Sequence, residues 1–346
     1  NIPAKVGMEV NEIQTPSLII DYNIFENNIL KMKEFALNNN VKLRPHAKMH
    51  KSVDVAKYQI NKGGAHGICC QKLSEAEIFV RAGIKDILIT NQITDAFKLE
   101  RFAKIVSKEL KIGCCVDNEE NIINIQKAVE RNNSIIDIYI EYDCGANRCG
   151  IKSFNEINEL IKIIKKMANL NFIGFQAYNG SIQHIEDYKI RHIEVKNTCN
   201  KIRELKAYFI KHSPFITGVG TGCFDLEVNE EVYDEIQVGS YAFMDAHYSS
   251  LKHDRKLNNS NDFENSLFIL TGVMSKALQK HAVVDAGLKS IAVDSGLPKT
   301  INSELKYIKC SDEHGIIADP YNILKINDKI RLIPGHCDPT CNLHDW

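Results

Sequence analysis

The sequence predicts an α/β fold, in which a TIM (β/α)8 barrel is followed by a second, mainly antiparallel β domain. Eight short apolar runs recur through the first two thirds of the chain, and amphipathic segments separate most of them. Strands that alternate with helices indicate a parallel sheet, and eight such units are enough to close a barrel. The runs lie near residues 41–43, 66–70, 86–89, 112–116, 135–141, 172–177, 214–219 and 235–238.

The remaining elements predict the domain limits. Residues 22–38 carry apolar side chains at helical spacing after Asp21, which can cap a helix, and the apolar run 17–20 before them is left over from the barrel count. From about Tyr248 the apolar runs follow one another without long helical segments, as in an antiparallel sheet; they are 267–270, 281–284, 290–293, 315–318 and 329–333. We therefore expect a barrel over 24–245 and a β domain built from 1–23 and 246–346.

Composition narrows the class of partner and the compartment. The chain has 43 lysines and arginines against 44 acidic residues, so its formal charge is -1. It has no run of basic residues, and we therefore expect neither nucleic acid nor a membrane surface as a partner. The eleven cysteines are an odd number and several lie within apolar runs, which indicates free thiols in a reducing, cytoplasmic setting. No apolar stretch is long enough to span a membrane, and residues 1–5 lack the apolar core of a secretory signal. Because the chain starts with Asn, a removed leader stays open.

The segment 43–51 is the first candidate for chemistry. It contains Arg44, His46, Lys48 and Lys51 directly after the first barrel run. If residues 42–48 are extended, Arg44, His46 and Lys48 share a face, and neighbouring positive charge would lower the pKa of the lysine amine, which could then condense with an aldehyde. Barrel active sites lie at this end of the strands. The alternative is that the lysines are surface residues or phosphate contacts.

The loops after the seventh and eighth runs predict a phosphate site. Their candidate residues are Thr217, Gly218, Gly220, Thr221, Gly222, Ser240 and Tyr241. Glycines let backbone amides approach an anion, hydroxyls add donors, and barrels often hold phosphate at these two loops. A phosphate site across the barrel mouth from a lysine suggests pyridoxal 5'-phosphate (PLP), although a plain tight turn would also explain the glycines.

Two further loops are expected to contact the middle of such a cofactor. Arg148 follows the fifth run and could hold the phenolic oxygen of the ring or a substrate carboxylate, and Tyr178 follows the sixth run and could face the pyridine. Alternatively, Arg148 pairs with Asp143 and only shapes its loop.

The C-terminal segment predicts a metal site. In an extended chain His336 and Asp338 share a face, and an imidazole with a carboxylate suits a divalent cation that keeps open positions. A closed zinc site of His336, Cys337, Cys341 and His344 is the alternative, although its spacing is atypical.

Eight motifs occur in order along the chain: RPHAKMHKS, EYDCGANRCG, FQAYNGSIQH, TGVGTG, QVGSYAFMD, VDAGLKS, SDEHG and GHCDPTCNLHD. Together they resemble the D-threonine aldolase and D-serine dehydratase family of fold-type III PLP enzymes over almost the whole length. The resemblance implies an alanine-racemase-like barrel with a β domain, a homodimer, a PLP Schiff base on Lys48 and a divalent metal on His336 and Asp338. It also places a histidine at His184, our candidate catalytic base; the alternative is that His184 is a helix-start or surface histidine.

The metal pair favours one branch of the family. His-x-Asp resembles the D-threonine aldolases, which use manganese, magnesium or a similar hard ion, whereas His-x-Cys with zinc resembles the eukaryotic D-serine dehydratases; zinc stays an alternative here. We therefore expect an aldolase that cleaves a small D-3-hydroxy amino acid, D-threonine or a relative, to glycine and an aldehyde. A D-serine or D-threo-3-hydroxyaspartate dehydratase that gives an oxo acid and ammonia is the alternative. A non-catalytic PLP-binding protein is disfavoured. The smallest fold-type III relatives, which have no established turnover, are barrels that lack the second domain and its metal pair.

Overall fold

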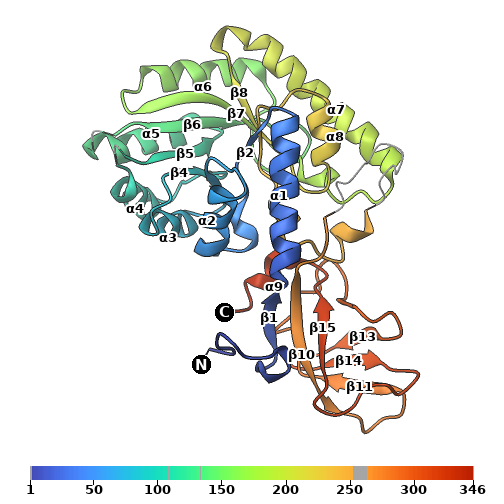
Figure 1. Cartoon of the computed structure of the whole chain (residues 1–346). Helices are drawn as coiled ribbons and strands as arrows, with labels where there is room; N and C mark the ends of the chain where they lie inside the picture. Colours follow the sequence, from blue (N-terminus) through green and yellow to red (C-terminus); the bar gives the residue numbers. More distant parts are fainter. Residues whose placement is uncertain (1, 108, 133, 252–262, 346) are drawn as a thin grey trace. The chain divides into compact units, whose positions relative to one another are not determined.

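The computed structural model describes residues 2–107, 109–132, 134–251 and 263–345. They form two compact units (Figure 1). The barrel unit comprises residues 32–239, and the β unit comprises the described residues of 2–31, 240–251 and 263–345. Helix α1 (Tyr22–Asn38) contains the first boundary between them. The limits expected from the sequence, 24 and 245, lie several residues from these boundaries.

The barrel unit alternates strands with helices. Its strands are β2 (Lys42–Leu43), β3 (Ile68–Cys70), β4 (Asp86–Ile89), β5 (Lys111–Val116), β6 (Ile136–Glu141), β7 (Leu170–Ala177), β8 (Phe215–Gly218) and β9 (Glu235–Ile236). Its helices are α2 (Val53–Asn61), α3 (Leu73–Arg81), α4 (Ala96–Ile105), α5 (Glu119–Val129), α6 (Phe154–Lys166), α7 (Tyr188–Tyr208) and α8 (Phe224–Asn229), with short 3-10 turns η2 (Ala47–Met49), η3 (Glu130–Asn132), η4 (Gly180–Ile182) and η5 (Ile210–His212). All eight predicted barrel strands are confirmed.

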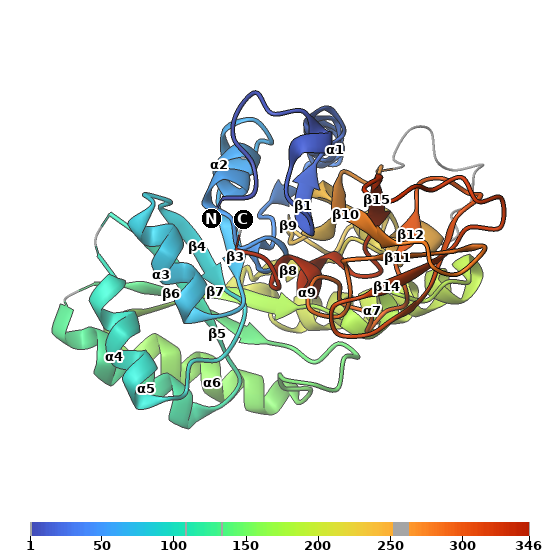
Figure 2. The same cartoon turned by 90° about the horizontal axis from the view of Figure 1, so that it is seen from below.

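The eight strands form one parallel sheet in the order β2-β9-β8-β7-β6-β5-β4-β3. A parallel bridge between His46, just after β2, and Cys69 in β3 joins the two ends of this order, as barrel closure requires. Helices α3 to α6 lie outside strands β4 to β7 in both views (Figures 1 and 2). The strands read as continuous apolar runs because both of their faces are buried.

Helix α6 illustrates how the sequence positions the outer layer. Its buried residues Ile157, Leu160, Ile161 and Ile164 recur at the helical spacing that places them on one face. The Ser153 hydroxyl caps the first turn by accepting from the Glu156 amide, and a cap of this kind is worth about 1 kcal/mol. Lysines close the last turn, where they complement the helix dipole.

The β unit is built on one antiparallel sheet. Its strands are β1 (Ser17–Ile20), β10 (Leu267–Ser275), β11 (His281–Val284), β12 (Lys299–Thr300), β13 (Lys306–Cys310), β14 (Gly315–Ala318) and β15 (Lys329–Ile333), with α9 (Cys337–Cys341) and the 3-10 turns η1 (Val10–Glu12), η6 (Ser240–Ala242) and η7 (Tyr248–Ser250). The order is β12-β15-β10-β11-β14-β13, and β1 also pairs with β10. Buried apolar side chains from most of these strands form a core of the unit, with Ile269, Val284 and Ile317 among them.

Three details of this unit differ from the sequence prediction. The two-residue strand β12, at one end of the sheet and with neither residue buried, was not predicted. Residues 290–293, expected as a strand, form none. Ser290 ends a turn in which the amides of Ser290 and Ile291 both donate to the Gly287 carbonyl, and residues 291–293 have no regular structure. Strand β13 was not predicted, since it lies at the sheet's end and buries only Tyr307, so its sequence has no apolar run. No described helix has the length and apolar character that crossing a membrane requires.

Candidate functional site

Lys48 lies in η2, just past the C-terminal end of β2. The prediction of an extended chain through residue 48 is wrong, because the strand ends at Leu43 and the backbone turns at Ala47. His46 caps this turn: its Nδ1 accepts from the Lys48 amide at 3.4 Å, and its Nε2 lies 2.9 Å from the Thr90 hydroxyl. The Lys48 side chain is partly buried.

Arg44 does not act as the expected neighbouring cation, because carboxylates surround it. Its side chain is 2% exposed, its Nε donates to Glu235 at 2.9 Å, and its Nη1 pairs with Asp86. Burial by itself would raise the pKa of Glu235, but the charge of Arg44 and the hydrogen bond from His66 outweigh it and bring this pKa to about 2. Arg44 is therefore part of a buried ion pair within the barrel.

The two histidines beside Lys48 carry no charge at neutral pH. Burial lowers the pKa of His46 well below its ordinary value, and the charges of Lys48 and, more weakly, Arg148 lower it further. Burial also lowers the pKa of His50 to about 4, although hydrogen bonds with Gln59 and Ser52 oppose the shift. Because Lys48 and Arg148 both act on His46, the fold brings these two cations to the same region.

Arg148 is held from both sides. Its guanidinium lies 3.8 Å from Glu141 Oε1 and 6.0 Å from the centre of the Tyr178 ring, and 53% of its side chain stays exposed. Glu141 is buried, which raises its pKa, while Gln92 donates to it at 2.6 Å. The alternative partner, Asp143, pairs instead with Lys152 at 3.3 Å. Sequence reasoning missed Glu141, and the signal was a charged residue that ends an apolar run.

The glycine-rich loop after β8 has most of its amides occupied. The Gly220 amide donates to Glu227 Oε2 at 3.3 Å, and the Gly222 amide donates to Gln183 Oε1 at 3.1 Å. The buried Thr221 hydroxyl has no hydrogen-bond partner among the residues described. Val219 has φ +72°, a left-handed conformation that costs a β-branched residue about 1–3 kcal/mol. The loop is therefore strained, with Thr221 as its unsatisfied polar group.

Gly218 and Thr217 lie in β8, before the loop. The Thr217 hydroxyl is inside the barrel, where it donates to Glu235 at 2.6 Å and accepts from Gln237 at 2.7 Å. A Cβ at Gly218 would lie 2.2 Å from the Ala177 carbonyl oxygen, so the close strand contact needs glycine.

His184 follows Gln183 in the segment that connects η4 to α7, and its side chain is partly buried. Gln183 is completely buried, and its Nε2 donates to Glu227 at 3.1 Å. Burial raises the pKa of Glu227 to about 7, although hydrogen bonds from Gln183, Gly220 and Tyr233 favour its ionised form. Neither Gln183 nor Glu227 was predicted, because nothing in the sequence places a helix residue beneath a loop.

Ser240 and Tyr241 lie in η6 of the β unit. The Ser240 hydroxyl donates to Asp338 Oδ1 at 3.3 Å. Tyr241 is completely buried and contacts the Phe263 ring edge-on, with 5.6 Å between centroids.

The predicted metal pair lies at the start of α9. The expectation of an extended chain is wrong here too: His336 is the extended residue before the helix, and Asp338 belongs to its first turn. His336 Nδ1 donates to Asp294 Oδ2 at 2.7 Å, which leaves Nε2 as the nitrogen available to a metal. Metal-bound histidines usually have such a carboxylate behind them.

The alternative zinc site has little support from the contacts of its members. His344 Nε2 donates to the Ser290 carbonyl at 2.9 Å, and Cys337 is a buried thiol whose pKa burial raises well above the ordinary value. No cluster of three or more His, Cys, Asp or Glu side chains suited to a metal occurs in the described part of the chain.

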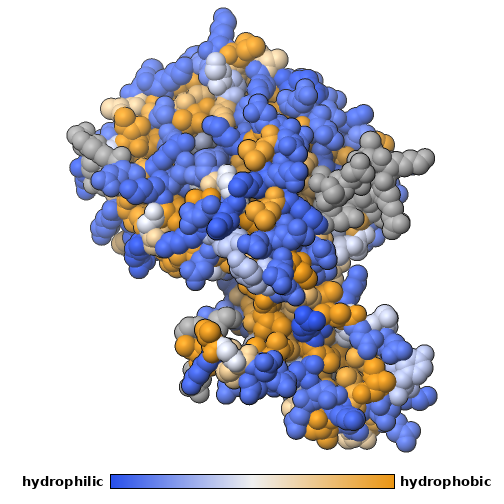
Figure 3. Space-filling model, in the orientation of Figure 1, coloured by the Kyte–Doolittle hydropathy of each residue, from blue (hydrophilic) through white to orange (hydrophobic). Residues whose placement is uncertain are grey.

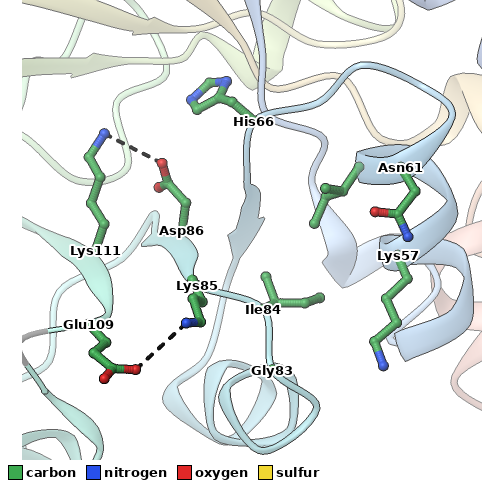
Figure 4. Close-up of a pocket in the computed structure, with 10 residues that line it drawn as sticks. Lys57, Asn61, His66, Gly83, Ile84, Lys85, Asp86, Glu109 and Lys111 are labelled. Carbon is green, nitrogen blue, oxygen red and sulfur yellow. Dashed lines mark ion pairs between the residues drawn. The ribbon is translucent and has the colours of Figure 1, made fainter.

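A cavity of about 490 Å3 lies at the opposite end of the barrel strands (Figure 4). Its lining includes His66, which precedes β3, and Asp86 and Lys111, which begin β4 and β5. Lys111 pairs with Asp86 at 3.4 Å. None of the predicted site residues lines this cavity, and residues at this end of a barrel usually serve stability.

Comparison with known proteins identifies the family. The family model "Alanine racemase, N-terminal domain" matches residues 20–247, and "Putative serine dehydratase domain" matches residues 266–346. The chain belongs to the D-threonine aldolase and D-serine dehydratase family of fold-type III enzymes. This confirms the resemblance read from the motifs, and it implies PLP as the cofactor.

The similar proteins cover nearly the full length. A 3-hydroxy-D-aspartate aldolase from Paracoccus denitrificans is 46% identical over 100% of this chain and 91% of its own, and a D-threonine aldolase from an Arthrobacter species is 39% identical over 99% and 90%. The crystal structure of a D-threonine aldolase from Filomicrobium marinum matches with a TM-score of 0.94 at 35% identity, covering 100% of this chain and 93% of that one, which confirms the predicted fold class. A D-serine dehydratase from Dictyostelium discoideum is only 25% identical over 95% and 91%.

Proposed function

We propose that this protein is a PLP- and divalent-metal-dependent aldolase that cleaves D-3-hydroxy amino acids to glycine and an aldehyde. The observation that carries the proposal is the full-length similarity to two aldolases, at 46% and 39% identity, against 25% for a dehydratase. The proposed metal pair supports the same assignment, because its second position holds Asp338, as in the His-x-Asp pattern of the D-threonine aldolases.

The barrel unit has groups that fit PLP. The buried Thr221 hydroxyl lacks a partner among the described residues, and it lies in a loop after β8, where barrels often bind phosphate. Lys48 would hold the cofactor through its amine, and Arg148 and Tyr178 would contact its ring. Thr217, Gly218, Gly220 and Gly222 would shape the phosphate end, and Ser240 and Tyr241, which belong to the β unit, are proposed as further cofactor-binding residues. Bound PLP supplies an electron sink for the bond that breaks at Cα.

The chain's own residues would then handle protons and charge. Nδ1 of the neutral His46 accepts a hydrogen bond from the Lys48 amide, which fixes the turn that carries the lysine. Arg148, half exposed above buried Glu141, can orient the phenolic oxygen or the substrate carboxylate. His184 would act as the base that takes the proton from the substrate's β-hydroxyl, since an imidazole exchanges protons readily near neutral pH.

The β unit has a donor set that fits a divalent cation. His336 presents Nε2 while Asp294 holds its Nδ1. Asp338 adds a carboxylate whose Oδ1 accepts from the Ser240 hydroxyl and the Cys337 thiol. Two protein ligands leave open positions for substrate oxygens, and a carboxylate favours manganese or magnesium over zinc. Such a metal supplies Lewis acidity toward the β-hydroxyl.

We also propose that the enzyme is a cytoplasmic homodimer. All eleven cysteines are free thiols, as expected in a reducing compartment. Large apolar side chains are exposed on the β unit, among them Met274, Leu278, Ile308, Tyr321 and Ile326. The face of this unit seen in Figure 3 has hydrophobic areas, drawn in orange. Patches of this kind often bind a second subunit.

Product analysis tests the proposal. The protein is loaded with PLP and Mn²⁺ and incubated with D-threonine, D-3-hydroxyaspartate and D-serine, and glycine, aldehyde, oxo acid and ammonia are quantified. We expect glycine and an aldehyde from the first two substrates. Oxo acid and ammonia without glycine would instead identify a dehydratase, and no turnover with bound PLP would indicate a non-catalytic binding protein. Lys48→Ala and His336→Ala should each abolish the products, whereas the surface variant Arg203→Met should not.

A further inference from the structure

The glycine-rich loop is tied to the segment before His184 by two buried side chains. Gln183 Oε1 accepts from the Gly222 amide, and Gln183 Nε2 donates to Glu227 Oε2 at 3.1 Å. Glu227 Oε2 also accepts from the Gly220 amide. Both side chains are completely buried, so these bonds do not compete with water.

The glycines serve this arrangement by leaving room. A Cβ at Gly222 would lie 1.9 Å from the Gln183 carbonyl oxygen, and a Cβ at Gly220 would lie 2.4 Å from Gln183 Oε1. The Cys223 thiol adds a further contact by donating to the Ile182 carbonyl at 3.4 Å. The loop therefore packs directly on the backbone and side chain of Gln183.

The far side of Glu227 is closed as well. The Tyr233 hydroxyl donates to Glu227 Oε1 at 3.3 Å, and it also lies 3.1 Å from the Ala177 carbonyl at the end of β7. The amides of Gly220 and Gly222 are thus occupied by protein groups, and the Thr221 hydroxyl between them is the buried loop group left unsatisfied among the described residues.

We propose that Gln183 and Glu227 are positioning residues for the cofactor phosphate. Their hydrogen bonds hold the amides of Gly220 and Gly222 against buried protein groups, so that the Thr221 hydroxyl is the group that the loop donates to the phosphate. This inference rests on the proposed function, because it requires PLP as the ligand. It assigns the glycines a steric role and Thr221 the polar one. It also means that phosphate binding and the placement of the His184 segment depend on the same side chain, Gln183.

Comparing PLP with pyridoxal, which lacks the phosphate, tests the proposal. The apoprotein is titrated with each compound, and the dissociation constants are measured by absorbance and fluorescence for the wild type, Gln183→Leu, Glu227→Leu and Glu227→Gln. In Gln183→Leu and Glu227→Leu we expect the Kd for PLP to rise on the order of tenfold or more, because a buried amide loses its acceptor. The Kd for pyridoxal should not change. Glu227→Gln should bind PLP nearly as the wild type does, since the amide oxygen can still accept from Gly220 and Gln183.

Two controls separate positioning from general stability. Asn169→Ala removes another buried side-chain amide just before β7 begins, which accepts from Gln126 Nε2 at 3.0 Å and donates to the Ser134 carbonyl at 2.8 Å. This variant should lower the melting temperature without changing the ratio of the Kd values for PLP and pyridoxal. Thr221→Val should lose phosphate-dependent affinity, and Gln183→Leu added to it should cost little more, because both act on one interaction.

The outcomes distinguish the two levels of the argument. If the wild type binds neither compound, the proposed function itself fails. If the wild type prefers PLP but Gln183→Leu and Glu227→Leu keep the same preference, or weaken PLP and pyridoxal equally, the positioning role is refuted while the cofactor assignment stands.

Discussion

Replacing Arg44 by methionine should destabilise the barrel strongly at neutral pH. The guanidinium is 2% exposed and Glu235 is completely buried, so the substitution leaves a carboxylate without its cation inside the barrel. Breaking a buried pair from one side typically costs about 3–5 kcal/mol. The pKa of Glu235 gives a similar size: a fall from 4.5 to about 2 corresponds to about 3 kcal/mol of stabilisation.

The pH dependence of this loss has a defined sign. In the wild type the depressed pKa means that the stabilisation is complete above pH 4.5 and is lost as the pH falls through about 2. In Arg44→Met burial raises the pKa of Glu235, and the carboxylate can escape its penalty by taking up a proton in acid. The difference in unfolding free energy between wild type and variant should therefore be largest near pH 7 and shrink toward pH 4.

Urea unfolding followed by circular dichroism measures this difference. Arg203→Met is the matched control, because Arg203 pairs with Glu230 at 3.1 Å but is half exposed, and exposed pairs contribute about 1 kcal/mol or less. The double variant Arg44→Met/Glu235→Gln should recover much of the stability, since it removes the isolated charge. An Arg44→Met protein within about 1 kcal/mol of the wild type at pH 7 would refute the reasoning.

Three further predictions concern the proposed site. Lys48→Ala should lose covalently bound cofactor, so that borohydride reduction no longer fixes PLP to the chain, while the melting temperature of the apoprotein is unchanged; labelling of the variant to the wild-type extent would exclude this lysine. Because its pKa is raised from 4.5 to about 7, Glu227 should cost the wild type about 3 kcal/mol of unfolding free energy as the pH rises through this range. Glu227→Gln should not show this pH-dependent loss in urea unfolding, and the same pH dependence in both proteins would contradict the raised pKa. Asp294→Asn should weaken manganese binding about 10–100-fold in calorimetric titration, because His336 loses the carboxylate that orients it, whereas unchanged affinity would argue against a metal on His336.

The order of elements could be read from the sequence because each one carries its own local signal. The eight apolar runs correspond to the eight parallel strands, since a strand buried on both faces must be apolar throughout. Helix α6 likewise shows its buried stripe in the spacing of Ile157 to Ile164. Signals of this kind depend on neighbours a few residues apart. They failed where burial was slight, as in β13, where an irregular segment carried apolar residues, as at 290–293, and where the chain turned in place of staying extended, as at Ala47 and at the start of α9.

The partners of the site residues were decided by tertiary structure alone. The sequence placed Arg44 and Lys48 on one face, but Arg44 finds Glu235, 191 residues away, and the chain turns before Lys48. The glycine loop could be located by its composition, whereas its contacts with Gln183 and Glu227 come from packing between segments up to 39 residues apart. Composition and spacing determine which residue types and local elements exist; which charges and amides are already satisfied depends on distant groups that only the folded chain brings within hydrogen-bonding distance.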